Sequence, residues 1–521
     1  MFQDSAGTTA AAVGQTVGLI LDKSKGLAIG PELLGAGAPA LVGTATTATY
    51  NTGTGAATTV RVDGSNLSSI QFAGLTAQSW YKVTVTGASG AVVIRLTNSG
   101  GAFVDQFSGS RTVYVNTGAA TAINLSPFTN GTSVSFTVAS IVLVSGNHAY
   151  QSTAASRPIL ACHPTGGRRN QFVHTEAFAN PAWVKGGGGM GLTAVATDGY
   201  ATAPDGSMTA SRVQLSLNGG TTSGDFSRIY QQYNIPGASG VFSIWMRSTD
   251  GVSNYVVQMQ DPNDFGNPKT VTGTWQQFTV TALDSGAVNY GIRLRGGQTP
   301  TNSNTADILI WHPQLEDGST ATAYQKVASS YEITEAGIQT FYHLAHDGVD
   351  DYLVTNSIDF SGSDKVTLWA GARKLSDASA ALLAELSASA SANNGAFYIS
   401  APESTGASGN FAFKSRGDNN NGLAASSAVV APTTVVLTGQ GSIAADSSIL
   451  RINGAQAATA ATDQGAGNYG NAYPLYIGRR GGSTLPFNGY LYGLIIRGGA
   501  SDTAAIQRTE RYLGAKTGVT W

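Results

Sequence analysis

The stretch Leu475–Gly499, LYIGRRGGSTLPFNGYLYGLIIRGG, carries the strongest structural pattern in the chain. Its first three residues are apolar or aromatic and are followed by a glycine, which predicts a short strand. From Phe487 to Leu491, every second residue is apolar or glycine, the period that places side chains on one face of a strand. The buried phase resumes at Leu494, and this slip of one residue predicts a β-bulge. The stretch therefore predicts two strands of a β-domain, joined by a glycine-rich loop.

The composition of the whole chain agrees with this prediction. The chain has 521 residues, of which 66 are glycine and 12% are charged. Hydrophobic residues make up 42%, which is enough for several cores. A chain of this length exceeds one ordinary core and favours three or four domains. Because glycine- and threonine-rich sequence with short alternating runs is typical of all-β proteins, we predict tandem antiparallel β-sandwich (jelly-roll) domains.

Charge and cysteine content argue against several classes of protein. The net charge is −2 and the 29 Lys and Arg residues are scattered, so we expect no nucleic-acid binding. Cys162 is the only cysteine, which excludes an intrachain disulfide. We expect no membrane span, because no window approaches the ~20 apolar residues that a membrane helix needs. The first residues lack the basic region and apolar core of a secretory signal, which favours a cytosolic or a virion protein.

The first third of the chain divides into a leader, a sandwich and a linker. Residues 1–35 contain two short apolar runs that cannot bury a core alone, so we predict a docking segment. Residues 36–155 form the first predicted jelly-roll β-sandwich, with alternation in Trp80–Thr86 and a hairpin at Gly87–Gly90. Residues 156–169 contain two prolines and two glycines and form a predicted linker.

Two further sandwiches are predicted downstream. Residues 170–330 end, like residues 36–155, in an apolar strand, a glycine and the tripeptide Ala-Tyr-Gln. This repeat predicts two sandwiches of one type in tandem. We expect the tyrosine of each tripeptide to pack the end of its sandwich's chain segment against the core of that sandwich. Residues 331–521 form the last predicted sandwich, in which Asn453-Gly454 predicts a two-residue hairpin.

A short helix is predicted after the last strand. Its expected features are an N-cap at Ser501 or Asp502, a buried face with Ile506, Thr509 and Leu513, and a stop at Gly514.

Several motifs resemble known families. Two motifs of the last predicted sandwich resemble laminin-G/concanavalin-like domains. The closing strands of such domains are similar to Tyr-Ile-Gly at 476–478 together with Phe-x-Gly-x-Leu-x-x-Leu-x-Ile at 487–496. Their first strand resembles HDGVDDYL at 346–353. The run FANPAW at 178–183 resembles the opening of carbohydrate-binding-module-like jelly rolls, which implies such a fold for residues 170–330. The leader FQDSAGTT...GQTVGLILDKSKGL resembles an N-terminal segment of tailed-bacteriophage virion proteins.

No motif for catalysis or for a cofactor is present. His343 and His346 are three apart and are expected on opposite faces of a strand, which argues against a shared metal. A single cysteine excludes a thiolate zinc site. Asp347, Asp350 and Asp351 resemble the calcium ligands of some laminin-G-like domains, but calcium takes six or more oxygens, and turn-forming aspartates are the leading interpretation. We therefore predict no catalytic residue, no metal and no cofactor.

Sugar binding calls for exposed aromatic faces on which pyranose rings stack. Trp183, Tyr230 and Tyr233 lie in or near loops of the carbohydrate-module-like region and are the candidate glycan-binding residues. A structural role is the alternative for each of them. Trp245, Trp275 and Trp369 fall within alternating strands, and we expect them in the core.

These resemblances imply a non-enzymatic structural protein of a tailed-phage virion, a tail fibre or other appendage that adheres to host-surface or environmental glycans. The implied partners are other virion proteins, contacted through residues 1–35, and further copies of the chain in a homotrimer. A head fibre or capsid decoration protein is one alternative. A polysaccharide-degrading enzyme with accessory binding modules is another, although every long segment is already assigned to a sandwich.

Overall fold

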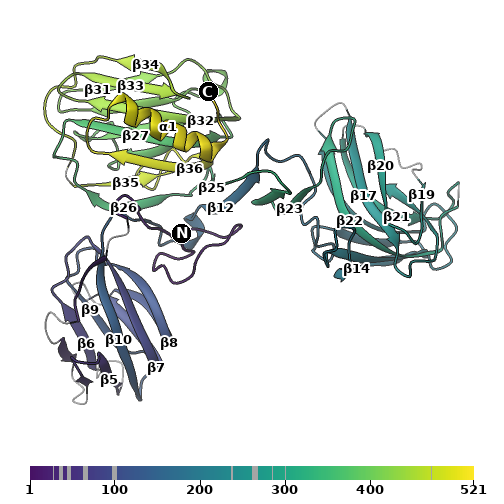
Figure 1. The fold of residues 1–521 in the computed structure, drawn as a ribbon, viewed down its shortest axis with the longest axis horizontal. Coiled ribbons are helices and arrows are strands. Elements are labelled where there is room, and N and C mark those ends of the chain that lie inside the picture. Colours follow the sequence, from purple (N-terminus) through teal and green to yellow (C-terminus); the bar gives the residue numbers. More distant parts are fainter. Residues whose placement is uncertain are drawn as a thin grey trace. The chain divides into compact units, whose positions relative to one another are not determined.

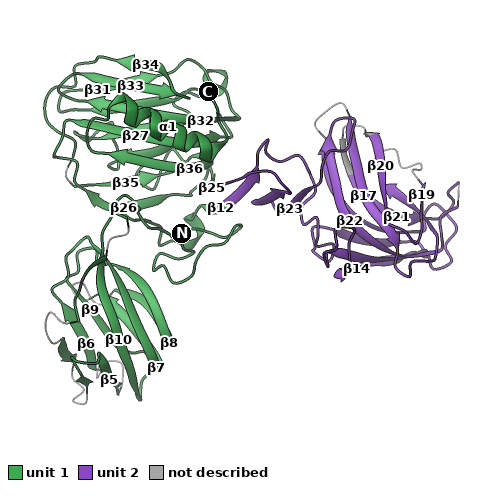
Figure 2. Ribbon diagram, in the orientation of Figure 1, with its two compact units in different colours: residues 1–160, 343–521 green, residues 161–342 purple. Residues whose placement is uncertain are grey.

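A computed structural model describes residues 1–26, 29–34, 39–43, 48–62, 68–96, 102–235, 239–260, 268–283, 286–299, 301–470 and 472–521. The fold is all-β, as predicted, and its sheets are almost wholly antiparallel (Figure 1). The chain divides into two compact units, residues 1–160 with 343–521 and residues 161–342 (Figure 2). The α-helix found in the described ranges is too short and too polar to cross a membrane.

The first sandwich consists of one sheet that folds over its own core. Its strands are β2 (Ile29–Glu32), β3 (Ala40–Gly43), β4 (Thr49–Tyr50), β5 (Ala56–Arg61), β6 (Ser68–Ala73), β7 (Trp80–Leu96), β8 (Phe103–Asn116), β9 (Ala122–Pro127) and β10 (Thr132–Val144). Their order is β3-β6-β9-β7-β10-β5-β4, with β2 beside β10 and β8 beside β7. Val83, Ile94 and Leu125 are fully buried in the core between the layers.

The hairpin predicted at Gly87–Gly90 is wrong, because the chain continues through these residues as strand β7. The first half of β7 pairs with β10 and the second half with β9, while β8 runs along both halves. Register shifts lie on both sides of Ala88, and Gly87 has a φ of 63°. The glycines thus kink one long strand instead of ending it, and a kinked strand can serve both layers of the sandwich.

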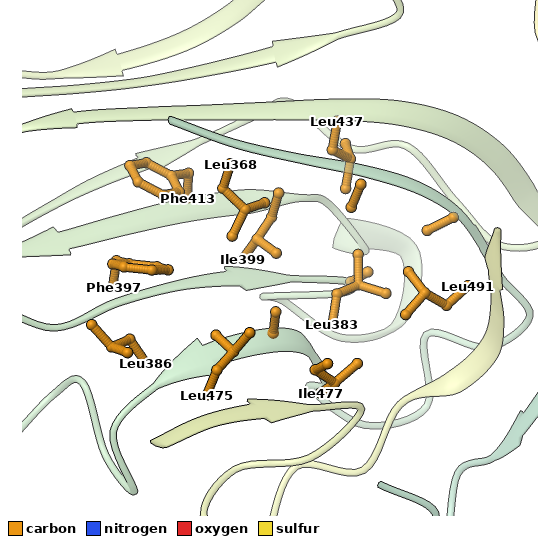
Figure 3. Packing of buried hydrophobic residues seen from close by; sticks show 14 of the residues in the cluster. Leu368, Leu383, Leu386, Phe397, Ile399, Phe413, Leu437, Leu475, Ile477 and Leu491 are labelled. Atoms are coloured by element: carbon orange, nitrogen blue, oxygen red, sulfur yellow. The ribbon is translucent and has the colours of Figure 1, made fainter. Parts of the chain in front are cut away.

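The C-terminal sandwich has two sheets. The first sheet contains, in spatial order, β1 (Leu19–Ile20), β11 (Ala149–Tyr150), β26 (Leu353–Ile358), β35 (Tyr473–Ile477), β28 (Leu382–Leu386), β29 (Phe397–Ser400), β30 (Ala412–Arg416) and β31 (Asn421–Ala425). The second contains β25 (Thr340–Asp347), β36 (Asn488–Arg497), β27 (Lys365–Lys374), β32 (Thr433–Ser442), β33 (Ser447–Ile452) and β34 (Ala455–Ala460). Leu368, Phe397 and Leu437 meet in the core (Figure 3).

The closing stretch forms both predicted strands, but β35 and β36 belong to opposite sheets. The predicted β-bulge is confirmed: Gly371 pairs with Gly493 and Ala372 with Leu491, which leaves Tyr492 as the extra residue. The two-residue hairpin is also confirmed, since Ile452 pairs with Ala455 across Asn453 and Gly454. Both turn residues have positive φ, 49° and 79°, as an Asn-Gly turn of this kind requires.

Helix α1 (Thr503–Thr517) packs on β27, β32 and β36 of the second sheet. Asp502 is the N-cap, and its Oδ1 accepts a hydrogen bond from the Ala505 amide at 2.6 Å. Ile506 and Leu513 are buried against Trp369, as predicted for this face. The predicted stop at Gly514 is wrong: the helix continues to Thr517 and ends at Gly518, which has a φ of 76°.

The leader is divided between two parts of the first unit. Val17 and Leu19 are fully buried, and β1 pairs with β11, which in turn pairs with β26 of the C-terminal sandwich. Residues 29–32 instead pair with β10 in the first sandwich. The predicted boundary after residue 35 therefore does not coincide with the change of sandwich.

The second unit is a jelly-roll sandwich with two five-stranded sheets. One sheet has the order β13 (Val184–Gly188), β16 (Phe226–Ile235), β21 (Gly286–Arg295), β18 (Tyr255–Gln260) and β19 (Pro268–Val271). The other has the order β14 (Leu192–Ala201), β15 (Ala210–Ser216), β22 (Thr305–Asp317), β17 (Gly240–Ser248) and β20 (Gln276–Leu283).

Further short elements lie along the chain between the strands already described. The predicted linker contains a strand, β12 (Ile159–Pro164), whose Cys162 pairs with Glu332 of β24 (Glu332–Glu335). β24 also pairs with β23 (Gln325–Ser329). Two 3₁₀ turns occur in the described chain, at Ala154–Ser156 and Gly406–Ser408.

Candidate functional site

Arginine and glutamine side chains gather on one face of the sheet β13-β16-β21-β18-β19. Ile229, Ile292 and Met259 point into the core and are each 1% exposed. Since neighbouring residues of a strand face opposite sides, the residues next to these three lie on the outer face. We call this outer surface the arginine face, and it consists of Phe226, Arg228, Tyr230, Gln258, Gln260 and Arg293.

Arg228 lies between two aromatic rings of its own strand. Its guanidinium carbon is 4.8 Å from the ring centroid of Phe226 and 4.6 Å from that of Tyr230. Strand β13 has glycines beside this stack, and a Cβ atom on Gly188 would lie 2.3 Å from the Phe226 ring. In the described part of the chain, the buried Nε of Arg228 has no hydrogen-bond partner. The rings hold this guanidinium in place by cation–π attraction, and the Arg228 side chain as a whole is half-buried.

Arg293 lies directly opposite Arg228 in the sheet register. Its Nε donates to Oε1 of Gln258 at 2.9 Å, and the Gln258 amide nitrogen donates to Oε1 of Gln298 at 2.8 Å. Arg293 and Gln258 are 5% and 2% exposed, although they lie on the face away from the core. The loop after β21 explains part of this burial, because its Ser303 amide donates to the Val256 carbonyl and so runs along β18.

Gln260 lies next to this network on β18. It is 5% exposed, and its Oε1 atom has no hydrogen-bond donor among the described residues. A buried amide oxygen without a partner costs about 1–3 kcal/mol. The face therefore combines fixed positive charge with an unused buried acceptor.

The structure separates the three sequence-predicted glycan-binding residues. Tyr230 lies half-buried on the arginine face and forms one side of the Arg228 stack. Trp183 is 2% exposed and packs 5.0 Å from Phe172 and 4.6 Å from Phe178, measured between ring centroids. Its indole nitrogen donates to the His174 carbonyl at 2.9 Å. Trp183 is thus a core residue whose ring has no free face for a sugar, contrary to the sequence prediction.

Tyr233 packs against the hydrophobic core of the second unit and is half-buried. Burial raises the pKa of its hydroxyl. It is three positions from Tyr230 on β16, so the two rings lie on opposite faces of the sheet. They cannot form one stacking platform, and Tyr230 alone contributes to the arginine face.

Sequence reasoning missed Arg228, Arg293, Gln258 and Gln260. A signal was present in β16, where Phe226, Arg228 and Tyr230 recur with period two around the apolar Ile229. The contribution of β18 and β21 depends on strand order, which places residues far apart in the chain beside one another.

Asp347, Asp350 and Asp351 of the C-terminal sandwich lie close together. One carboxylate oxygen from each lies within 4.8 Å of the other two. Asp347 Oδ1 accepts hydrogen bonds from the amides of Val349 and Asp350 at 2.8 and 3.2 Å. Asp351 Oδ2 accepts from the Asp347 amide at 3.0 Å, and burial followed by the Asp347 charge raises the pKa of Asp351 to about 7. These bonds match the turn-forming role that the sequence favours.

No protein-family model matches the chain, and no curated protein matches it. Among solved structures, a Ruminococcus gnavus IT-sialidase CBM40 is 14% identical over 32% of this chain and 95% of its own, with a TM-score of 0.24. Mouse laminin alpha1 domains LG4-5 are 10% identical over 51% of this chain and 85% of theirs, with a TM-score of 0.23. A Paenibacillus barcinonensis Xyn10C CBM22 tandem is 10% identical over 59% of this chain and 100% of its own, with a TM-score of 0.19.

Proposed function

We propose that this protein is a non-enzymatic glycan-binding protein whose arginine face binds the acidic groups of a polysaccharide. The observation that carries the proposal is the half-buried guanidinium of Arg228, which is held between the rings of Phe226 and Tyr230. A guanidinium fixed in this way pays little further entropy to hold a carboxylate or sulfate with two parallel hydrogen bonds.

Neutral parts of the same ligand have a partner beside Arg228, because the half-buried Tyr230 ring offers apolar surface to a sugar ring. A site of this size on one sheet face gives weak binding, and many copies on one particle multiply it.

The sequence resemblances support placing this protein in a tailed-phage virion, as a tail fibre or other appendage, with a homotrimer as its assembly. A head fibre or capsid decoration protein is the second placement. Docking of residues 1–35 to other virion proteins would use the exposed side chains of this segment, because Val17 and Leu19 are buried within the chain. Electron microscopy of particles labelled with an antibody to this chain tests the placement: label on tails supports an appendage, label on heads a decoration protein, and no label overturns both.

Calorimetric titration of the full chain with polygalacturonate and with dextran tests the binding function. We expect binding of the carboxylated polymer and none of the neutral one. Arg228→Met is expected to weaken binding at least tenfold, about 1.4 kcal/mol. Arg247→Met is the matched control, because Arg247 lies 5.4 Å from the Trp275 ring centroid and belongs to the other sheet of the same unit. Equal binding of both polymers, or unchanged binding by Arg228→Met, would contradict the proposal.

An assay for turnover distinguishes the proposed binding protein from the competing class, a polysaccharide-degrading enzyme. Incubation of the full chain with polygalacturonate is expected to produce no new reducing ends. Release of reducing ends that scales with protein concentration would favour the enzyme.

A further inference from the structure

The C-terminal sandwich contains a pocket of about 170 Å³ that is lined by Leu382, Tyr398, Glu403, Lys414, Arg480 and Leu485. The register of the first sheet builds it, because Glu385 of β28 pairs with Tyr398 of β29, and Tyr398 pairs with Lys414 of β30. These three side chains therefore form one row on the face of the sheet away from the sandwich core. Leu382 and Leu485 add apolar walls.

Arg480 is anchored by a fully buried carboxylate. Its Nε lies 3.1 and 3.0 Å from the two oxygens of Glu385, which is 0% exposed. Glu385 also accepts a hydrogen bond from the Ala390 amide at 2.6 Å. Within the described chain, the guanidinium makes its hydrogen bonds through Nε, so its two terminal nitrogens remain able to donate to a ligand.

Lys414 supplies a second cation, which forms no hydrogen bond to a carboxylate within the described residues. Its Nζ lies 4.8 Å from the Tyr398 ring centroid and 3.3 Å from Oγ of Ser391. No ion pair to Lys414 occurs in the described part of the chain. Burial lowers the pKa of Lys414, and the nearby Arg480 charge adds to this effect while Glu403 opposes it. An anion between Lys414 and Arg480 would relieve the repulsion between the two cations.

Glu403 gives the pocket an acceptor as well. The Tyr398 hydroxyl donates to its Oε1 at 2.8 Å, and burial together with Glu403 raises the pKa of Tyr398, so this hydroxyl stays protonated. The second Glu403 oxygen has no described donor and accepts hydrogen bonds only. A bare inorganic anion would meet this carboxylate as a like charge, whereas a ligand with a hydroxyl group would donate to it.

We propose that this pocket binds one acidic sugar residue, with its carboxylate between Lys414 and Arg480 and a ring hydroxyl donating to Glu403. The volume favours a single ring, because pockets for drug-sized ligands start at about 300 Å³. This site lies in a different sandwich from the arginine face. Binding at the pocket can therefore be tested separately from binding at the arginine face.

Calorimetric titration of the full chain with D-glucuronate, D-glucose and inorganic sulfate tests the inference. We expect glucuronate to bind at least tenfold more tightly than sulfate, which has no hydroxyl group, and glucose to give no signal at the same concentrations. Lys414→Met is expected to lower glucuronate affinity at least tenfold. Lys516→Met is the matched control, because Nζ of Lys516 lies 5.1 Å from the Tyr512 ring centroid on helix α1, outside the pocket, and we expect less than a twofold change.

Glu403→Gln keeps the shape of the pocket and removes its negative charge. We expect sulfate to bind several-fold more tightly to this variant and the preference for glucuronate over sulfate to be lost, a readout that misfolding would not produce. Unchanged glucuronate binding by Lys414→Met, or equal affinities for glucose and glucuronate, would overturn the inference. So would glucuronate binding that Arg228→Met abolishes and Lys414→Met leaves intact, because the ligand would then belong to the arginine face.

Discussion

Lys374 and Asp377 form an ion pair that is almost fully shielded from solvent. Their side chains are 0% and 6% exposed, and Nζ lies 2.6 Å from Oδ1. Nζ also lies 4.8 Å from the Phe411 ring centroid. Removing one member leaves the other charge buried without a partner, which is the costly way to break such a pair.

Asp377→Ala is therefore expected to lower the free energy of unfolding of the C-terminal sandwich by about 3–5 kcal/mol. Asp364→Ala is the control, because its partner Lys365 is 45% exposed and such a surface pair contributes about 0–1 kcal/mol. Denaturant unfolding followed by tryptophan fluorescence measures both. Similar losses for the two variants would contradict the assignment of Lys374 as a buried cation.

His312 is stacked between Trp311 and Tyr324, with ring centroids 3.2 and 3.4 Å away. Burial lowers its pKa from 6.5 to about 3. Below pH 6.5 the unfolded chain binds a proton that the folded chain does not bind, so the stability of the second unit falls as the pH drops from 6.5 toward 3.

His312→Phe keeps a ring in the stack and removes the titration. We expect a shallower fall of Tm between pH 6.5 and 4 than in the parent chain, measured by scanning calorimetry. His312 has a φ of 50°, so phenylalanine lowers the absolute Tm, and the slope against pH is the informative quantity. Parallel slopes for parent and variant would show that the pKa of His312 does not differ between the folded and the unfolded chain.

At the scale of elements, helix α1 shows how a local rule can fail. Glycine inside a helix is normally about 1 kcal/mol worse than alanine. At Gly514, however, a Cβ atom would lie 2.9 Å from the Val519 carbonyl oxygen and 3.1 Å from the Trp521 ring. The chain after the helix folds back over this glycine, so its missing side chain makes room for a tertiary contact.

Gly514→Ala is accordingly expected to destabilise α1 despite its better helix propensity. Hydrogen exchange of the α1 amides should speed up in this variant. Ala504→Gly, at an exposed helix position, is the opposite control, where the ordinary propensity loss of about 1 kcal/mol applies. Slower exchange in Gly514→Ala would mean that Trp521 does not pack on the helix.

At the scale of the whole molecule, the leader completes the C-terminal sandwich. The Phe2 amide donates to the Leu19 carbonyl at 2.9 Å, the Val17 amide to the Pro158 carbonyl at 2.8 Å, and the Gln151 amide to the Gly18 carbonyl at 2.9 Å. The last two bonds tie the start of the chain to residues 141 and 133 positions later. The first unit is therefore continuous in space although its two parts are separated in sequence by the second unit.

Leu19→Ala is expected to cost about 2–5 kcal/mol in the unfolding of the first unit, because Leu19 is fully buried. The second unit should unfold at an unchanged temperature, so one of two calorimetric transitions should move to lower temperature while the other stays in place. Leu41→Ala is the control, since Leu41 is 52% exposed and a surface change of this kind stays within about 0.5 kcal/mol. A shift of both transitions by equal amounts would contradict the division into two units.

Short-range sequence patterns were sufficient to predict several elements of the structure. The bulge at Tyr492 follows from a slip in alternation, the Asn453-Gly454 hairpin from two residues that tolerate positive φ, and the start of α1 from the cap at Asp502. Each depends on neighbours within a few residues, where backbone sterics and side-chain spacing decide the outcome.

Local patterns along the chain are enough to predict an all-β protein built from sandwiches, because the strand backbone imposes an alternation with period two. The pairing of strands is needed to show that Gly87–Gly90 kinks a strand, that Trp183 lies in a core, and that Arg228 faces Arg293. The reason is that a strand pattern records which residues share a face, but not which strand becomes its neighbour. A binding surface on a sheet is made by neighbouring strands, so it exists only once the strand order is set.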